Sequence, residues 1–252
     1  MNMKVKLHNE FKIVKYIMST QKYKAIFLFT LLLCMYGAFV IGITTGDFIG
    51  SIIKPFQFYL FNVFLFAIFF LINNNACSIL KNDFSFYIIR LDNKKNYVNT
   101  ELRISALLYS IHFVIIIMIM LSCYLLTTFN NIDVHNYNFY GISNVIYCIF
   151  YLFRYFVIGL IIILISTILH INSNRKKVII FEIIFLFFLC CFNEYIGLQD
   201  KVTFNVWKYF TLVDYSNFSL ELLSSVTMIL VLEIIFLLIY YFTNKFKKVV
   251  IS

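Results

Sequence analysis

Long apolar stretches recur along the chain and are separated by short polar segments. A helix that crosses a bilayer needs roughly 20 predominantly apolar residues, and six stretches meet that requirement. They are residues 25–44, 56–76, 104–127, 151–170, 177–196 and 219–242. The pattern predicts an all-α, polytopic membrane protein with six transmembrane helices, forming a single domain over residues 1–252.

The composition agrees with this class. Hydrophobic residues make up 62% of the chain and charged residues only 13%, whereas soluble domains carry about 25% charged residues. The N-terminus is long, basic and polar before the first apolar stretch, unlike a secretory signal peptide, so we expect the first span to stay attached. The six cysteines form no CxxC pair and are interpreted as small apolar residues, with no disulfide framework and no metal site.

Lysine and arginine are divided unevenly between the two sets of loops. With the N-terminus inside, most of the 21 basic residues fall in the inner segments, which are residues 1–24, 77–103, 175–177 and 245–248. The outer segments keep only Lys54, Arg154, Lys201 and Lys208. The positive-inside rule therefore predicts that both termini are cytoplasmic. The basic charge needs no nucleic-acid partner, because such segments are attracted to anionic lipid headgroups.

Two further segments are expected at the membrane surface. Residues 8–23 place Phe11, Val14, Ile17 and Met18 on one helical face, which predicts an amphipathic helix in the inner interface. Residues 139–150 are aromatic and are expected to form an interfacial or re-entrant segment on the outer face; the alternative is one overlong fourth helix. Arg154, near the outer end of the fourth span, is expected to contact lipid phosphates.

The segment between spans two and three, residues 81–103, is charged and partly amphipathic. Phe84, Tyr87, Ile88 and Leu91 share a helical face, which predicts a helix along the membrane surface. Asp92 and Asn93 favour a turn and can cap the helix that follows, which opens with Lys94, Lys95 and Tyr97. The segment is thus predicted to be a helix–turn–helix facing the cytoplasm. A plain basic loop is the alternative, although such a loop needs no amphipathic approach.

An amphipathic N-terminal helix, six spans, cytoplasmic termini and this charged turn resemble the six-helix permease subunits of bacterial ABC exporters. In that family the turn carries a leucine, polar or basic residues and an aromatic residue, similar to Leu91, Lys94, Lys95 and Tyr97 here. Asp92 and Asn93 stand where a proline and an arginine are often found in that family. The resemblance implies that the turn, including Asp92 and Asn93, docks on a cytoplasmic ATPase that binds ATP and Mg²⁺. It also implies a homodimer of permeases in the bacterial cell membrane.

Motifs for other chemistry are missing from the sequence. The chain has no GxxxxGK[ST] phosphate-binding loop, no HExxH and no GxSxG nucleophile turn, so no catalytic residue and no cofactor is expected on it. Three ionisable residues, His112, Glu182 and Glu233, lie within expected spans. Because a charge inside a bilayer is costly, they are candidates for the wall of a polar cavity. The alternative is that they hold helices together through hydrogen bonds.

The expected function is therefore ATP-driven export. The family includes exporters of antimicrobial and toxic peptides, such as phenol-soluble modulins, and the apolar spans suit a hydrophobic or amphipathic peptide. The sequence does not separate export of a toxin from protection against one. A membrane-embedded enzyme or peptide-processing factor, using His112, Glu182 or Glu233, is one alternative. A substrate-binding membrane subunit of an importer is another.

Overall fold

The computed structural model describes residues 3–42, 52–53, 55–56, 59–83, 94–127, 144–173, 175–194 and 218–246. Helices account for nearly all of these residues, and none of them lies in a strand. The elements are α1 (Met3–Ser19), α2 (Gln21–Tyr36), a π-helical turn η1 (Gly37–Gly42), α4 (Tyr59–Asn82), α6 (Lys94–Thr127), α7 (Asn144–Asn172), α8 (Arg175–Glu194) and α9 (Phe218–Phe246). The all-α class is confirmed.

Five of the described helical segments are long and apolar enough to cross a membrane. They are Gln21–Val40, Leu60–Asn82, Asn96–Cys123, Val145–Asn172 and Glu221–Thr243. They correspond to five of the six expected windows, and the protein therefore has the helices of a polytopic membrane protein. The remaining window, 177–196, coincides with α8, which packs against α4 and α7. Six spans stay a prediction.

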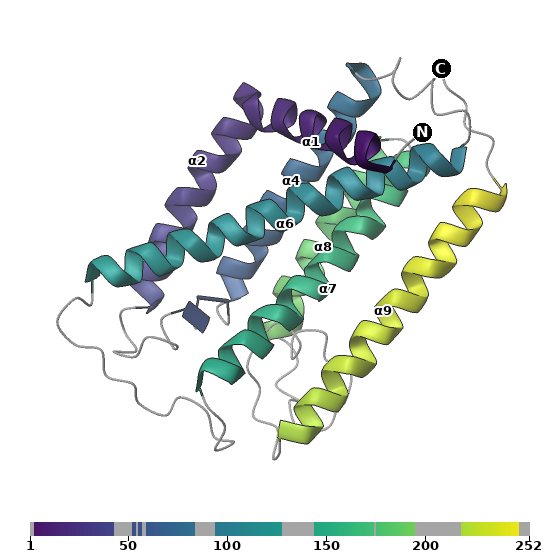
Figure 1. Cartoon of the computed structure of the whole chain (residues 1–252). Helices are drawn as coiled ribbons and strands as arrows, with labels where there is room; N and C mark the ends of the chain where they lie inside the picture. Colours follow the sequence, from purple (N-terminus) through teal and green to yellow (C-terminus); the bar gives the residue numbers. More distant parts are fainter. Residues whose placement is uncertain are drawn as a thin grey trace.

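The helices form a bundle with α4 at its centre (Figure 1). α4 contacts α1, α2, α6, α7 and α8, and it is the most buried of the five candidate spans. Its buried side chains are mainly aromatic and aliphatic, among them Phe61, Phe66, Phe69 and Phe70. A helix that carries large apolar side chains on several sides suits the interior of such a bundle.

α9 occupies the edge of the bundle (Figure 1). It packs mainly along α7. Near its C-terminal end, the Tyr240 hydroxyl donates a hydrogen bond to Asn99 Oδ1 on α6 at 2.8 Å, and Asn172 Nδ2 at the end of α7 donates to Thr243 Oγ1. The C-terminal ends of α7 and α9 therefore meet the beginning of α6 at one end of the bundle.

α1 lies across this same end (Figure 1). The chain turns from α1 into α2 at Thr20, whose backbone is extended and whose hydroxyl accepts a hydrogen bond from Tyr23 N. This is the usual role of an N-cap residue. Of the expected amphipathic face, Val14 and Ile17 are buried and Met18 packs against the same cluster of α4 and α6 side chains, whereas Phe11 is 48% exposed. α1 thus uses most of its apolar face to pack on the bundle.

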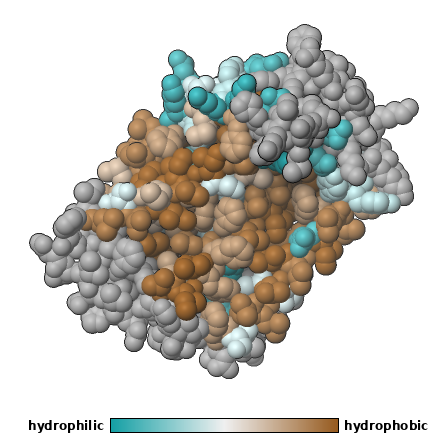
Figure 2. All heavy atoms as spheres, in the orientation of Figure 1, coloured by the Kyte–Doolittle hydropathy of each residue, from teal (hydrophilic) through white to brown (hydrophobic). Residues whose placement is uncertain are grey.

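Hydrophilic side chains gather at the α1 end in Figure 2, while apolar side chains form a broad band over the helix bodies. Exposed lysines of α1, of the start of α2 and of the end of α4 belong to this end. The band matches what a bilayer requires, since its hydrocarbon interior excludes charge.

The fourth expected span is longer than its window. α7 begins at Asn144, so residues 144–150 belong to one continuous helix, as in the alternative of an overlong fourth helix. The expected re-entrant segment is wrong for these residues, and residues 139–143 lie outside the described part of the chain. Tyr147 and Cys148 are buried within the main apolar cluster. Packing on the bundle, which the sequence pattern does not reveal, explains the extra helical turns.

Candidate functional site

A cluster of buried polar side chains joins α4, α7 and α8. Glu182 of α8 is only 5% exposed, and its carboxylate accepts two hydrogen bonds. Asn74 Nδ2 on α4 donates to Oε2 at 2.7 Å, and the Ser166 hydroxyl on α7 donates to Oε1 at 2.8 Å. Buried polar groups are normally paired in this way, because an unpaired one loses its hydration without replacement.

His170, one helical turn beyond Ser166, belongs to the same cluster. Its Nε2–H donates a hydrogen bond to Asn74 Oδ1 and lies 4.0 Å from Glu182 Oε1. The Lys81 ammonium at the end of α4 donates to the backbone carbonyl of His170 at 2.9 Å. Asn74 thus bridges an imidazole and a carboxylate, and it fixes the rotation of α4 against both neighbours.

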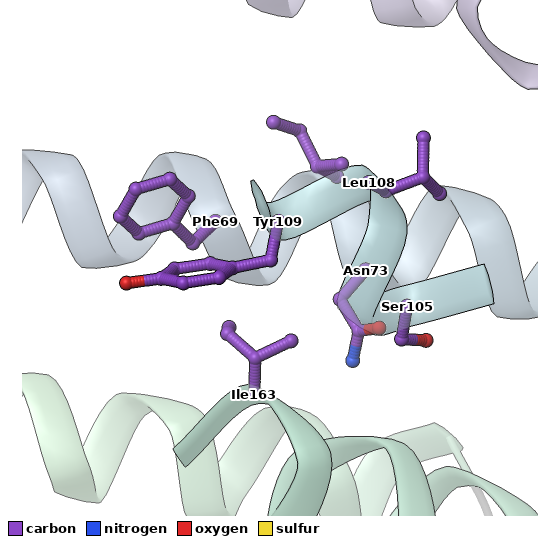
Figure 3. A pocket seen from close by; sticks show the side chains of 7 residues that line it. Phe69, Asn73, Ser105, Leu108, Tyr109 and Ile163 are labelled. Atoms are coloured by element: carbon purple, nitrogen blue, oxygen red, sulfur yellow. The ribbon is translucent and has the colours of Figure 1, made fainter. Parts of the chain in front are cut away.

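Asn73 extends the cluster toward α6. Asn73 Nδ2 donates to the Ser166 hydroxyl at 3.3 Å, and the Thr167 hydroxyl lies 3.1 Å from Asn73 Oδ1. Beside Asn73 is a cavity of about 10 Å³, lined also by Ser105 and by apolar side chains of α4, α6 and α7. In Figure 3 the side chains of Asn73 and Ser105 lie next to each other at this cavity. This volume is about the smallest that can hold one water molecule, and a water there would satisfy the Ser105 hydroxyl, which has no hydrogen-bond partner among the described residues.

The cluster lacks the geometry of a hydrolytic triad. A nucleophilic serine must donate its proton to a base that a third group orients. Here the Ser166 hydroxyl donates to Glu182, and the His170 ring donates to an amide oxygen. Within the described residues, no three His, Cys, Asp or Glu side chains are grouped to hold a metal ion. The arrangement can bind a proton and can hold three helices in register.

A second buried pair lies toward the other end of α7. Arg154 Nη1 is 2.9 Å from Glu221 Oε1 on α9 and donates to the Ser225 hydroxyl at 3.2 Å. Its guanidinium also lies over the ring of Tyr151, 5.0 Å from the centroid. Arg154 is 1% exposed, so the expected contact with lipid phosphates is wrong: α9 supplies the anion instead.

The three intramembrane candidates are not brought together. His112 is fully buried between α2 and α6, with Tyr23 and Thr30 as hydrogen-bond partners. Glu182 lies in the cluster described above. Glu233 is exposed on α9. The alternative interpretation of these residues is that they hold helices together through hydrogen bonds. The contacts of His112 and Glu182 agree with this alternative.

The side chains of most of the expected ATPase-coupling residues lie outside the described part of the structure. Leu91, Asp92 and Asn93 lie outside the described residues, and Lys94 and Lys95 are described only as the first turn of α6. Tyr97 is half-buried and packs against an apolar cluster formed by α6, α7 and α9. Their contact with an ATPase stays a prediction.

The sequence analysis predicted neither the hydrogen bonds of Asn73, Asn74 and Ser166 nor the Arg154–Glu221 ion pair. One signal was available, since three consecutive asparagines, residues 73–75, interrupt the second apolar stretch. Such amides are costly in a bilayer unless other helices satisfy them.

Comparison with known proteins identifies no relative of this chain. The sequence matches no protein-family model and no curated protein, and no solved structure matches the chain.

Proposed function

We propose that the chain is the membrane permease subunit of an ATP-driven exporter of the ABC type. The observation that carries the proposal is the assembly of α1 with the two helix ends that lie within the charged segment 81–103 and flank residues 84–93. The Tyr16 hydroxyl of α1 donates to Asp83 Oδ2 at 3.2 Å, directly after α4. Glu10 of α1 lies 3.2 Å from Arg103 Nε, near the beginning of α6.

These two contacts support a mechanical role for the charged stretch. The stretch is flanked by the central α4 and the long α6, and α1 makes a polar contact with each of these segments. The hydrogen bond from Tyr16 to Asp83, with the negative charge of that carboxylate, raises the pKa of the Tyr16 hydroxyl, which keeps it a donor. A push on residues 84–103 from outside the membrane would therefore move α1, α4 and α6 together.

The proposed transport cycle uses this coupling. Two permease copies stand on two copies of a cytoplasmic ATPase, which binds ATP and Mg²⁺. Closure of the ATPases moves the stretch 84–103, and α4 passes the motion to α7 and α8 through the Asn74–Glu182 and Asn73–Ser166 hydrogen bonds. A cavity between the permeases then changes from inward-facing to outward-facing.

The orientation in this proposal follows from charge. Lys12, Lys15, Lys22 and Lys24 are exposed at the α1 end, as are Lys81 and Arg103. The positive-inside rule favours the cytoplasm for that end, where an ATPase would be reached. Both termini are cytoplasmic in this orientation, and α1 lies at the inner interface of a bacterial cell membrane.

The proposed substrate is a hydrophobic or amphipathic peptide. Support comes from the exposed surfaces of the described helices, which are almost wholly aliphatic and aromatic over their central parts. A substrate that shares this chemistry can enter from the inner leaflet without crossing a charged barrier.

The test is co-purification with any ABC-type ATPase whose gene neighbours the gene for this chain. We expect the ATPase to remain bound through a tag on the permease, and Lys94→Glu with Lys95→Glu to release it. The matched control is Lys22→Glu with Lys24→Glu, which makes the same charge change at the same end of the bundle and should leave the ATPase bound. An ATPase that never co-purifies, or a chain that processes peptides without ATP, would refute the proposal and favour the membrane-enzyme alternative.

A further inference from the structure

α9 has one face that contacts the rest of the bundle. Its side chains pair with Arg154, pack in the main apolar cluster and meet α6 and the end of α7. They recur every three or four residues, as one helical stripe does. The members of this inner stripe are Glu221, Ser225, Met228, Leu232, Phe236, Ile239 and Thr243.

The opposite stripe is exposed along its whole length. It consists of Leu223, Val226, Leu230, Glu233 and Leu237, all of them exposed. Their spacing of three, four, three and four residues is the a/d pattern of a coiled-coil seam. Only 11% of the central window of this span is buried, against 28% to 56% in the other four candidate spans. α9 is therefore the span that the described bundle covers least.

Glu233 sits near the middle of the candidate span Glu221–Thr243 and on this outer stripe. It makes no hydrogen bond or ion pair with any described residue. The exposed basic side chains of the described helices lie on α1 and at the inner ends of α2, α4, α6 and α8, far from mid-span. A carboxyl at the centre of a bilayer is unfavourable unless a donor or water reaches it, so Glu233 requires a partner from outside this chain's described bundle.

We propose that the outer stripe of α9 is a docking surface for α9 of a second copy of this chain. Two copies inserted in the same direction run parallel, so each Glu233 meets its counterpart at the same depth. A protonated carboxyl both donates and accepts a hydrogen bond, so two such groups can pair with each other. A single polar residue in an apolar heptad seam also fixes register and partner number.

This inference gives the homodimer of the proposed function its contact surface. The role of the dimer in transport rests on the proposed function. The contact itself requires only that α9 spans the membrane. Its test therefore uses the full chain in lipid vesicles without any ATPase, so that failure of dimerisation and failure of export are separate results.

Photo-cross-linking tests the surface directly. Benzoylphenylalanine is placed at Leu237 on the seam or at Leu238 beside it, two leucines that are each 53% exposed. We expect irradiation to link two copies strongly from position 237 and several-fold less from position 238. Equal yields at the two positions, a product that contains another protein from position 237, or no product there in correctly inserted protein would overturn the proposal.

Substitution of Glu233 tests the chemistry. Glu233→Gln keeps both a donor and an acceptor, and we expect it to associate as the natural chain does. Glu233→Leu keeps the bulk but removes the hydrogen bond, and we expect association to weaken about three- to twenty-fold, the range for one interhelical hydrogen bond in a bilayer. Energy transfer between differently labelled copies measures both. Association of Glu233→Leu at the natural strength would contradict carboxyl pairing.

Discussion

Arg154 Nη1 lies 2.9 Å from Glu221 Oε1, and the two side chains are 2% and 1% exposed. The pair joins α7 to α9 across a sequence separation of 67 residues. Together with the apolar side chains of α9 that pack on the bundle and the hydrogen bonds Tyr240–Asn99 and Asn172–Thr243, this contact holds the helix to the bundle.

Neutralising one member of the pair should destabilise the protein severely. Breaking a buried ion pair by removing one of its two members typically costs about 3–5 kcal/mol. We expect Arg154→Met to lower the free energy of unfolding by about that amount, and Arg154→Met with Glu221→Leu to recover much of it. Unfolding in detergent, followed by circular dichroism, provides the measurement. A double variant as unstable as the single one would contradict an energetic link between the two residues.

Gly159 permits the close approach of α6 to α7. A Cβ at this position would collide with the hydroxyl of Tyr109, which donates to the Phe156 carbonyl at 3.2 Å. We expect Gly159→Ala to destabilise the bundle by about 1–3 kcal/mol, the usual range for overpacking. Tyr109→Phe removes the atom in the way, so Gly159→Ala with Tyr109→Phe should be less unstable than the sum of the two changes. Strictly additive unfolding energies would rule out the collision as the cause.

Glu182 and Glu233 should respond differently to the same substitution. Glu182→Gln places an amide N–H₂ against either the Asn74 amide or the Ser166 hydroxyl, both of which donate in the natural protein. The expected cost is about 1–3 kcal/mol, as for other buried groups that lose a partner. Glu233→Gln on exposed α9 is the matched control, and its unfolding midpoint should be unchanged. Equal midpoints for the two variants would argue against the Glu182 cluster.

His112 should be a neutral imidazole with its proton on Nε2. The Thr30 hydroxyl donates to the Ile26 carbonyl at 2.8 Å, so at 3.0 Å from Nε2 it can only accept. Nδ1 then accepts from the Tyr23 hydroxyl at 3.2 Å. Nitrogen-15 chemical shifts of labelled histidine distinguish the two tautomers. A dominant Nδ1–H form would contradict this network.

Thr30→Val should weaken the attachment of α2 to α6. The substitution keeps the shape of the side chain but removes the acceptor for His112 Nε2–H. Interhelical hydrogen bonds in bilayers contribute about 0.6 kcal/mol on average and up to about 1.7, and we expect a loss within that range. Thr227→Val, whose hydroxyl is exposed and bonds only within α9, is the control and should leave the unfolding free energy unchanged.

The sequence by itself determined the class of the protein and the approximate position of its long helices. Whether a segment can span a bilayer depends on its own length and apolarity, and both are local properties. The expected window 219–242 was therefore placed within two residues of the span Glu221–Thr243 in α9, whereas the span in α6, Asn96–Cys123, begins eight residues before the expected window 104–127. The burial of Cys34, Cys77, Cys123 and Cys148 also followed from the ordinary behaviour of this residue type.

Only the tertiary structure decided which polar side chains meet. Glu182 and Glu233 look alike in the sequence, each a lone carboxylate in an apolar stretch. The rotation of α8 turns Glu182 onto Asn74, which is 108 residues away, while the rotation of α9 leaves Glu233 outside. Likewise Arg154 meets Glu221 instead of lipid. Such pairings depend on how helices pack and turn against one another, and every apolar face of a membrane helix is an equally good candidate for packing until its neighbours are in place.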